Sequence, residues 1–495
     1  MKTLYKSLIA ISVFLIFIGC NDELTKEPIG LLTMDQVDTS PTITTLESSV
    51  SSSYQLLSST LNLVGEWQWD DGTVTRNDFI LEDIASSDMN KKWNPDGDQA
   101  WMDDISTFNF TSDNGAFNGI WLYDYEGINR INLAISYLTN SEVTQSVGIS
   151  DARKNQLLGE SHFLRAFYYF DLVNNFGDVP LLTQPLKSFA EAFEVAVRVP
   201  KAEIWIQINA DLLAAKELLP NSKYPSPAEP WRASKGAVIA MQAKVALYNE
   251  DWSSVITHVN ELESLGFYSL NVNYFDSFDV GKEFSDDEVI FAYDHISDQN
   301  PRKGNGLCAL IGWGFVAPTP DFISAFELND PRLLYTVDVA NQNPSKLLGN
   351  TVGDNKGNDD APSNKIYIRY ADVLLWKAEA LNETGDYDGA VAIINEIRNR
   401  ARTSPTADGS TVPPGTLVAR PNSTDPVQVK NWLMHERRVE LGFESQRFND
   451  LKRWGIAKSF LTGLGKNFQD KNYLYPIPQG EVDKSAGTIT QNPGY

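Results

Sequence analysis

The 495-residue chain contains 42% hydrophobic and 11% aromatic residues, which is enough to build a substantial core. Its formal net charge of -24 argues against a nucleic-acid-binding protein, because phosphate binding requires a basic surface. The same charge argues against electrostatic docking on anionic lipid.

The start of the chain predicts an export signal that ends in a lipidated cysteine. Lys2 and Lys6 form a positive segment, and residues 8–18 are an apolar run too short to span a bilayer comfortably. The run ends in Gly19-Cys20, which resembles a bacterial lipobox, although Phe17 replaces the usual Leu. We expect residues 1–19 to be a signal peptide, Cys20 to carry lipid, and residues 20–42 to form a tether. The alternative is an ordinary signal peptide with a chance cysteine.

Helices are predicted on both sides of a long irregular region. A first helix is expected at about 43–57, and residues 60–118 are then rich in Gly, Asn, Asp and Trp with little helical period. Helical period returns at 120–138. A further helix, with Asp151 as its N-cap, ends at Gly177, and Pro180 forbids continuation. This helix is apolar on nearly every side, so we expect it to be the central column of a helical scaffold.

Two later segments repeat each other after a helix expected at 201–219. Aligning Asp251 with Asp386 pairs Trp252 with Tyr387, and each aspartate lies between two helical stretches. A helix, a tight turn and a second helix are typical of a tetratricopeptide unit, so the repeat predicts stacked helical hairpins.

The C-terminal half has a second irregular region at about 270–365. Helix is expected to return at Lys365, to break for the polar loop 403–424, and to restart with Asp425 as N-cap and Pro426 at its first position. The tail from Tyr473 is punctuated by proline and is expected to be extended.

The segment from His435 to Gly455 interleaves charged and aromatic residues. Glu436, Glu440 and Glu444 recur every four residues, among arginines and large apolar side chains. This pattern favours Arg–carboxylate pairs partly buried against the scaffold, where they fix geometry more than they add stability. An active site is the alternative, because structural ion pairs imitate catalytic ones.

This segment resembles the C-terminal signature of the SusD/RagB family, nutrient-binding lipoproteins of the Bacteroidetes outer membrane. The chain is similar to that family at further motifs, in family order, which are Glu160 to Tyr169, Phe176 to Leu181, Pro318-Thr319, Asp330-Pro331-Arg332, Tyr475-Pro476-Ile477-Pro478 and Gln491 to Tyr495. The acidic Asn21-Asp22-Glu23 after the cysteine resembles the surface-export signal of Bacteroidetes lipoproteins. The resemblance implies a mainly α, tetratricopeptide-like helical scaffold that bears a loop-rich, glycan-binding region and forms one domain over 43–495. It also implies a SusC-like, TonB-dependent outer-membrane transporter as partner, and binding without cleavage.

Motifs for catalysis or cofactor binding are absent from the sequence. It contains no phosphate loop, dinucleotide fingerprint, HExxH or GxSxG. The four histidines show no metal-ligand spacing, and we expect His162 and His258 to lie in packed helices. Asn94-x-Asp96-x-Asp98 imitates the opening of a calcium loop, but Gln99 and Ile105 occupy the positions that require Gly and Glu. Cys308 is expected to be a small buried residue. We therefore predict no catalytic residue, metal or cofactor.

Tryptophans within a polar stretch are the main indication of a ligand. Four of them lie within 35 residues of the first irregular region, namely Trp67, Trp69, Trp93 and Trp101. Sugar rings stack on flat aromatic rings, and their hydroxyls need carboxylate, amide or Arg partners such as Asp96 and Asp98. Trp313 could reach the same surface from the second irregular region. The alternative is that these tryptophans pin the loops to the helices.

Three functions follow from these observations. The first is a lipid-anchored receptor at the cell surface that captures an oligosaccharide or polysaccharide and passes it to the transporter. The second is a surface glycoside hydrolase or lyase, which needs two carboxylates facing each other across a cleft. The third is a scaffold that binds peptides or proteins in its helical concavity.

Overall fold

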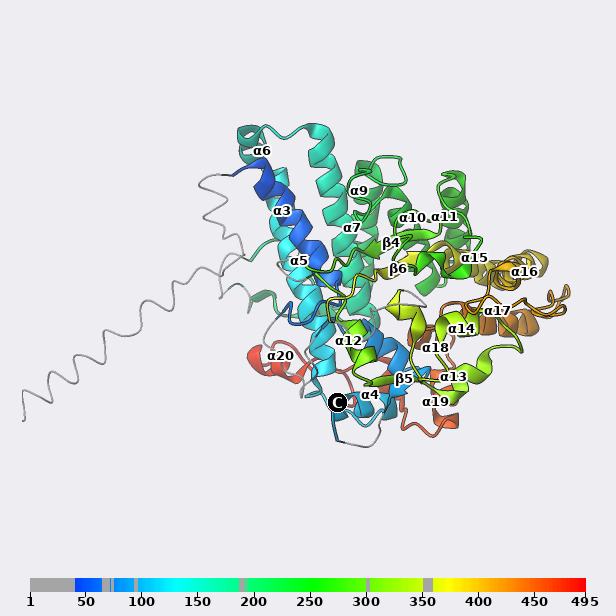
Figure 1. The fold of residues 1–495 in the computed structure, drawn as a ribbon. Coiled ribbons are helices and arrows are strands. Elements are labelled where there is room, and N and C mark those ends of the chain that lie inside the picture. Colours follow the sequence, from blue (N-terminus) through cyan, green and yellow to red (C-terminus); the bar gives the residue numbers. More distant parts are fainter. Residues whose placement is uncertain are drawn as a thin grey trace, which may run out of the picture.

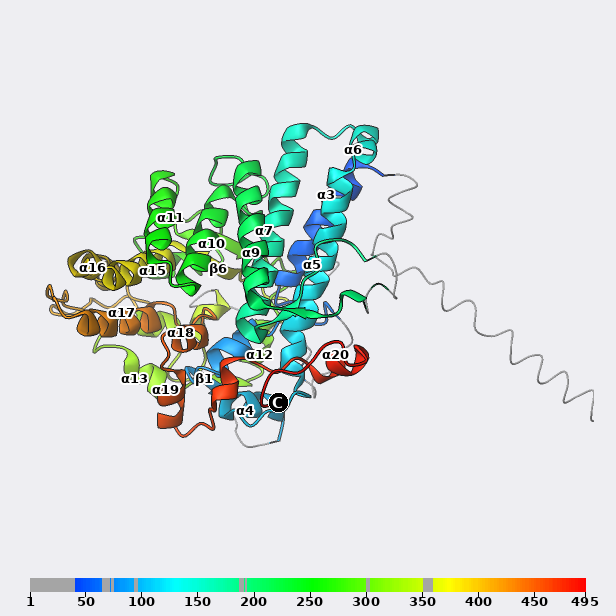
Figure 2. The same cartoon turned by 180° about the vertical axis from the view of Figure 1, so that it is seen from behind.

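The computed structural model describes residues 41–64, 72, 75–92, 97–186, 191, 194–299, 303–349 and 359–495. The mainly α fold predicted from the sequence is confirmed. Long helices stand side by side, shorter helices lie below them in Figures 1 and 2, and three two-stranded ribbons connect segments of the chain. Within these residues, no helix is long and apolar enough to cross a membrane.

The predicted long helices form close to the expected boundaries. In chain order the α-helices are α3 (Ile43–Tyr54), α4 (Ala100–Thr107), α5 (Asn118–Thr139), α6 (Ser141–Val147), α7 (Asp151–Phe176), α9 (Lys201–Leu218), α10 (Lys235–Tyr248), α11 (Trp252–Ser264), α12 (Leu307–Gly312), α13 (Pro320–Ala325), α14 (Arg332–Thr336), α15 (Tyr370–Glu383), α16 (Tyr387–Thr403), α17 (Pro426–Glu440), α18 (Arg447–Arg453), α19 (Ala457–Gly463) and α20 (Gln479–Lys484). The first predicted helix continues beyond α3 as the single turn η1 (Gln55–Leu57). Both irregular regions contain short elements that the sequence did not predict, among them the π-helix η3 (Ile80–Ile84).

Helix α7 is the predicted central column, packed against α3, α5 and α9 (Figure 1). The prediction that Asp151 is its N-cap is wrong, because the extended Ser150 precedes the helix and its hydroxyl accepts the Arg153 N–H at 3.3 Å. The helix ends as predicted at Gly177, which has a φ of +75°. Helix α5 approaches it closely at Gly127, where an added Cβ would lie 2.5 Å from the Tyr168 ring. A side chain at Gly127 would therefore force α5 and α7 apart.

The two predicted hairpins are α10–α11 and α15–α16, and α11 packs against α15. Asp251 and Asp386 cap the second helix of each hairpin by accepting the N–H groups of Ser254 at 3.2 Å and Gly389 at 3.0 Å. Both aspartates also donate their own N–H to the carbonyl oxygen five residues earlier, at 2.9 and 2.8 Å. The two aspartates therefore occupy equivalent positions in two turns of the same type.

Three antiparallel ribbons connect distant parts of the chain. They are β1 (Met89–Lys91) with β5 (Val316–Pro318), β2 (Val179–Pro180) with β3 (Arg198–Val199), and β4 (Val289–Tyr293) with β6 (Lys365–Arg369). The predicted return of helix at Lys365 is therefore wrong, because α15 begins only at Tyr370. Residues 365–369 instead pair with the buried apolar strand β4, a partner about 75 residues earlier in the chain that a local pattern does not reveal.

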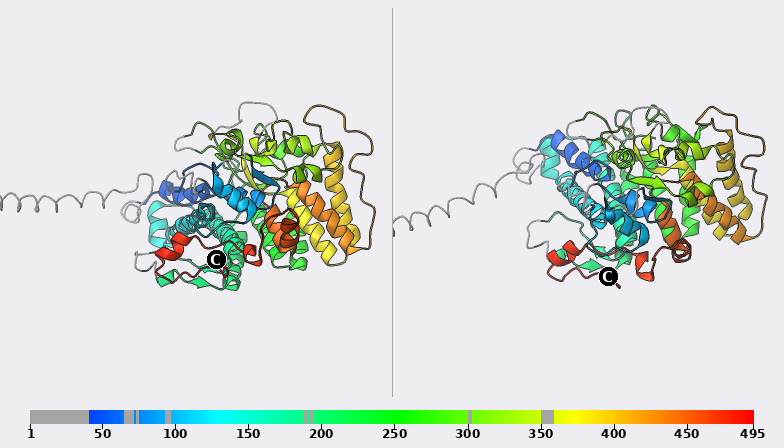
Figure 3. Two further views of the ribbon diagram at one scale, coloured as in Figure 1. Left: turned by 90° about the horizontal axis from the view of Figure 1, so that it is seen from below. Right: turned by 60° about the horizontal axis from the view of Figure 1, so that its bottom comes forward.

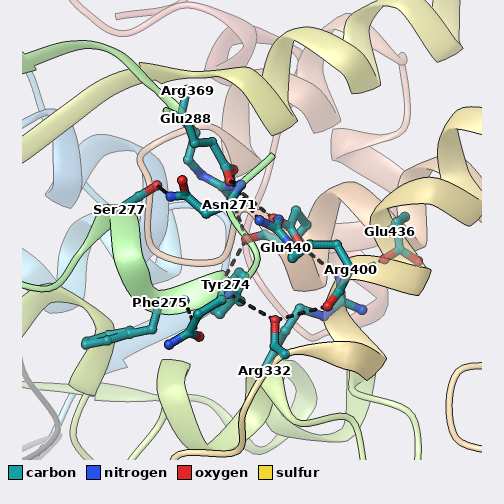
Figure 4. Close-up of polar contacts among 12 residues, drawn as sticks. Asn271, Tyr274, Phe275, Ser277, Glu288, Arg332, Arg369, Arg400, Glu436 and Glu440 are labelled. Carbon is teal, nitrogen blue, oxygen red and sulfur yellow. Dashed lines mark hydrogen bonds and ion pairs between the residues drawn. The ribbon is translucent and has the colours of Figure 1, made fainter. Parts of the chain in front are cut away.

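The charged C-terminal segment forms a buried ion cluster, as predicted. Glu440, at the end of α17, accepts hydrogen bonds from Arg332 at 2.9 Å, from Arg369 at 2.8 Å and from Arg400 (Figure 4). Glu288 accepts from Arg369 at 2.6 Å and from Arg400 at 2.7 Å. All five side chains are almost completely buried. The cluster fastens β4, β6, α14, α16 and α17 to one another, so we assign it to the scaffold.

Candidate functional site

The β1–β5 ribbon brings together the two sequence regions that were expected to bind ligand. Met89 pairs with Pro318 and Lys91 with Val316, and the Lys92 N–H donates to the Phe315 carbonyl oxygen at 2.8 Å. Strand β1 ends two residues before Trp93 in the sequence, and β5 begins three residues after Trp313. The ribbon therefore makes neighbours of segments that are more than 200 residues apart in the chain.

Trp313 is the predicted ligand-binding residue with the clearest geometry. It follows α12, and its N–H donates to the Ala309 carbonyl oxygen at 2.8 Å, which fixes the backbone. Its side chain is 46% exposed. The ring stands nearly perpendicular to that of Phe315, with the centroids 6.3 Å apart and an interplanar angle of 84°. A large flat ring held on an ordered backbone and half open to solvent is suited to stacking on a ligand.

A polar turn next to this ribbon supplies hydrogen-bonding groups that the sequence analysis missed. Lys92 Nζ donates to the Asn341 carbonyl oxygen at 2.7 Å and to Asn343 Oδ1 at 3.2 Å. Asp338 and Asn343 form a β-bridge, and the Asn341 amide donates to Asp338 Oδ2 at 2.7 Å. The signal for this turn was the spacing of Asp338, Asn341 and Asn343 in a polar stretch, a pattern typical of Asx turns.

Trp101 is not suited to the stacking role predicted for it. Its side chain is only 7% exposed, and its indole N–H donates to Gln99 Oε1 at 2.8 Å. It shares the buried face of α4 with Met102 and Ile105, so the ring anchors the loop region to the core. Asp98 is exposed, as a ligand-binding carboxylate must be. The other predicted residues, Trp67, Trp69, Trp93, Asp96 and the lipidated Cys20, lie outside the residues that the structure describes.

Two protein families match this chain, one in its N-terminal half and one in its C-terminal half. Residues 35–247 match a family described as "Starch-binding associating with outer membrane", and residues 335–495 match the SusD family. The chain belongs to the SusD/RagB family. The predicted family membership is therefore confirmed.

Relatives of this SusD/RagB chain match over nearly its whole length. SusD-like protein P2 of Formosa agariphila is 25% identical, over 98% of each chain. Surface glycan-binding protein A from Bacteroides fluxus is 25% identical, with a TM-score of 0.72 over 92% of this chain and 100% of that one. A laminarin-binding SusD-like protein is 24% identical with the same TM-score and coverage, and this likeness shows the fold. The tetratricopeptide-like SusD architecture is thus shared across the chain.

Three buried acidic residues of the first irregular region, Glu82, Asp83 and Asp88, bind the C-terminal segment. The Ser445 N–H donates to Asp83 Oδ2 at 3.1 Å, and the Asn449 N–H to Glu82 Oε2 at 2.9 Å. Burial raises the pKa of the Asp83 carboxyl, and the neighbouring Asp88 and Glu82 raise it further. Asp88 in turn accepts two hydrogen bonds from Arg438, at 2.9 and 2.6 Å. These carboxylates are buried and connect two parts of the scaffold, so we assign them to structure.

The described histidines that are strongly buried have protein partners. His295 Nδ1 lies 2.7 Å from the Lys303 carbonyl oxygen, and Nε2 accepts the Ser59 N–H at 3.3 Å. Burial lowers the pKa of this imidazole to about 3, so it is neutral. His162 Nδ1 lies 2.7 Å from Asp211 in a packed helix, as predicted. Among the described residues, no group of three or more His, Cys, Asp or Glu side chains could hold a metal ion.

Cys308 is the small buried residue that the sequence predicted. It is fully buried in α12 as a free thiol, and its Sγ lies 3.2 Å from the Ser363 hydroxyl. Burial raises the pKa of the thiol to about 11. Because the thiolate is the reactive form, this cysteine is inert at neutral pH.

Proposed function

We propose that this chain is a lipid-anchored receptor at the cell surface that captures an oligosaccharide or polysaccharide without cleaving it. The receptor delivers the glycan to a SusC-like, TonB-dependent transporter in the outer membrane. Residues 43–495 act as one SusD-like domain, and Cys20 carries the lipid. Membership of the SusD/RagB family and the glycan-binding names of the relatives support this function.

The observation that carries the proposal is the half-exposed ring of Trp313, which precedes strand β5 of the β1–β5 ribbon by three residues. A pyranose ring stacks its C–H face on the indole, while its hydroxyls bond to carboxylate and amide groups nearby. Asp98, Asn341 and Asn343 supply such groups, and we propose that Trp93 and Asp96, which lie outside the described residues, also bind the glycan. Such a site binds with modest affinity because few rings take part, and modest affinity permits release to the transporter.

Replacing Trp313 tests the site directly. The lipid-free chain, residues 21–495, is screened by affinity electrophoresis against neutral polysaccharides that include laminarin and starch, and the affinity for the glycan that binds is then measured by calorimetry. Trp313→Ala should weaken binding at least tenfold, about 1.4 kcal/mol, because the stacking surface is lost. Trp313→Phe should retain part of the affinity.

Ile206→Ala is a matched control, because Ile206 is an apolar side chain 70% exposed on α9, away from the ribbon. Equal affinities for wild type, Trp313→Ala and Ile206→Ala would refute this site.

Prolonged incubation with the bound glycan tests the absence of catalysis, since a hydrolase would release reducing ends and the receptor should not.

A further inference from the structure

A second cleft lies between the C-terminal end of α3, the loop before α10 and the end of β4. Its volume is about 260 Å³, and its walls include Gln55, Trp231, Tyr293, Asp294 and Lys303. In Figure 1, α3 and β4 lie above α12 and β5, which carry Trp313 and the ribbon. None of the residues assigned above to the glycan site lines this cleft. We refer to it as the Trp231 cleft.

One wall of the Trp231 cleft is an indole held in a fixed orientation. The Tyr54 ring meets Trp231 at 88°, with centroids 5.1 Å apart, and the Arg232 guanidinium lies 4.5 Å from the centroid of the indole. Tyr54 is itself fixed, because its hydroxyl donates to Glu160 at 2.9 Å and accepts the Ala233 N–H at 2.9 Å. A flat ring that is already oriented loses little entropy when a ligand stacks on it.

The opposite side of the cleft carries a carboxylate and an ammonium group, those of Asp294 and Lys303. The Asp294 side chain is partly exposed, and it interacts electrostatically with Lys303, which also lines the cleft. Burial raises the pKa of the Asp294 carboxyl, and Lys303 lowers it. A partly exposed carboxylate can accept hydrogen bonds from the hydroxyl groups of a ligand, and an ammonium group can donate them.

We propose that the Trp231 cleft is a second glycan-binding site, which takes one neutral hexopyranose unit of the captured polysaccharide. The indole offers a face for the C–H side of the sugar, Asp294 accepts hydrogen bonds from hydroxyls, and Lys303 and the Gln55 amide donate them. A volume just below the roughly 300 Å³ of small drug-sized pockets suits one sugar ring. The strongly negative chain disfavours a polyanionic glycan.

This inference rests on the proposed function and adds a second point of contact for a long glycan. A polymer that engages both sites binds the second one intramolecularly, so overall affinity rises without any new type of contact. A short oligosaccharide gains nothing in this way, because it reaches only one site at a time.

Fluorine NMR of the lipid-free chain labelled with 5-fluorotryptophan separates the two sites. The chain has 12 tryptophans, and Trp231→Phe and Trp313→Phe assign the two resonances that matter. Laminarihexaose, maltohexaose and a galacturonate hexamer are the probes. We expect a neutral hexasaccharide to shift both resonances with saturation and the acidic hexamer to leave Trp231 unchanged. Asp294→Asn should weaken the response of Trp231 at least tenfold and leave that of Trp313 as in the wild type.

The outcomes distinguish this inference from the proposed function. If the Trp231 resonance stays unchanged while the Trp313 resonance shifts, the second site is overturned and the receptor function still stands. A Trp231 response with unchanged affinity in Asp294→Asn would overturn the role of the carboxylate and therefore the site as built here. If neither ring responds to any probe, both proposals fail. The ten other fluorotryptophan resonances report whether each variant is folded.

Discussion

Glu440 is the central carboxylate of the buried ion cluster. Its carboxylate serves three arginines from three different elements, and its side chain is fully buried (Figure 4). Burial alone would raise the pKa of this carboxyl, but Arg400, Arg369 and Arg332 together hold it below its ordinary value of 4.5. The sequence predicted that such pairs exist from the four-residue spacing of the glutamates. It could not predict their partners, because Arg332 and Arg369 come from elements about 70 to 110 residues away.

We expect Glu440→Gln to lower the free energy of unfolding by about 3–5 kcal/mol, because it leaves buried arginines without a shared anion. Chemical denaturation at pH 7 measures this change. Since the folded pKa is depressed, the contribution of Glu440 is complete above pH 4.5 and is lost as the pH falls below that value. The difference in the free energy of unfolding between wild type and Glu440→Gln should therefore become smaller in acid.

Glu327→Gln is the control for this variant. Glu327 also contacts arginines, Arg398 and Arg420, but its side chain is 31% exposed. Solvent screens such pairs, so we expect a loss of about 1 kcal/mol or less. Equal effects of the two substitutions would show that burial does not set the contribution of Glu440.

At the scale of elements, the turn between paired helices is built twice with different residues. Glu250 has a φ of +57° directly before Asp251, and Gly385 has a φ of +91° directly before Asp386. The left-handed conformation is strained for a residue with a Cβ and unstrained for glycine. No atom lies within 4 Å of a Cβ added at Gly385, so the cost of a side chain at this position comes from the backbone conformation alone.

Exchanging these turn residues should change stability in opposite directions. Glu250→Gly relieves a strain of about 1–2 kcal/mol, partly offset by a more flexible unfolded chain, so we expect a gain of up to about 1 kcal/mol. Gly385→Ala should lose about 1 kcal/mol by the same reasoning. Thermal and urea unfolding of the two variants measure these changes, and changes of the same sign in both would contradict the explanation.

Local patterns predicted the elements whose signals lie within one stretch of chain. The period of α5, the Gly177 stop of α7 and the paired aspartates are signals of this kind. Strand β6 was missed because its partner β4 is distant. Trp101 was misassigned because its surroundings read as polar loop, although its four-residue spacing from Ile105 already placed both on one helical face. Trp313 can be recognised in the sequence as an aromatic residue between two glycines. Its position next to the β1–β5 ribbon, however, depends on tertiary structure.

At the scale of the whole molecule, attachment to the membrane depends on the chain before α3. No helix in the described residues can cross a bilayer, and the charge of -24 disfavours adsorption on anionic lipid. Seen from below in Figure 3, the helical scaffold and the loop-rich side form one body. A lipid at Cys20 is therefore the attachment that we propose.

Removing the cysteine tests this attachment. Cys20→Ala should move the protein from the membrane fraction to the soluble fraction, because each buried acyl methylene contributes roughly 0.8 kcal/mol to anchoring. Fractionation of cells followed by immunoblotting measures the distribution. Retention of Cys20→Ala in the membrane fraction, with wild-type abundance, would contradict lipidation at this position.

The burial of Cys308 has a practical consequence for labelling this protein. The chain has two cysteines, and a lipid on Cys20 would leave Cys308 as its remaining thiol, sealed in α12 and protonated at neutral pH. Maleimide dyes and spin labels therefore leave the native protein unmodified. A single cysteine placed on an exposed side chain such as Ile206 provides a selective attachment point, so distances to a partner can be followed without first replacing any residue of the interior.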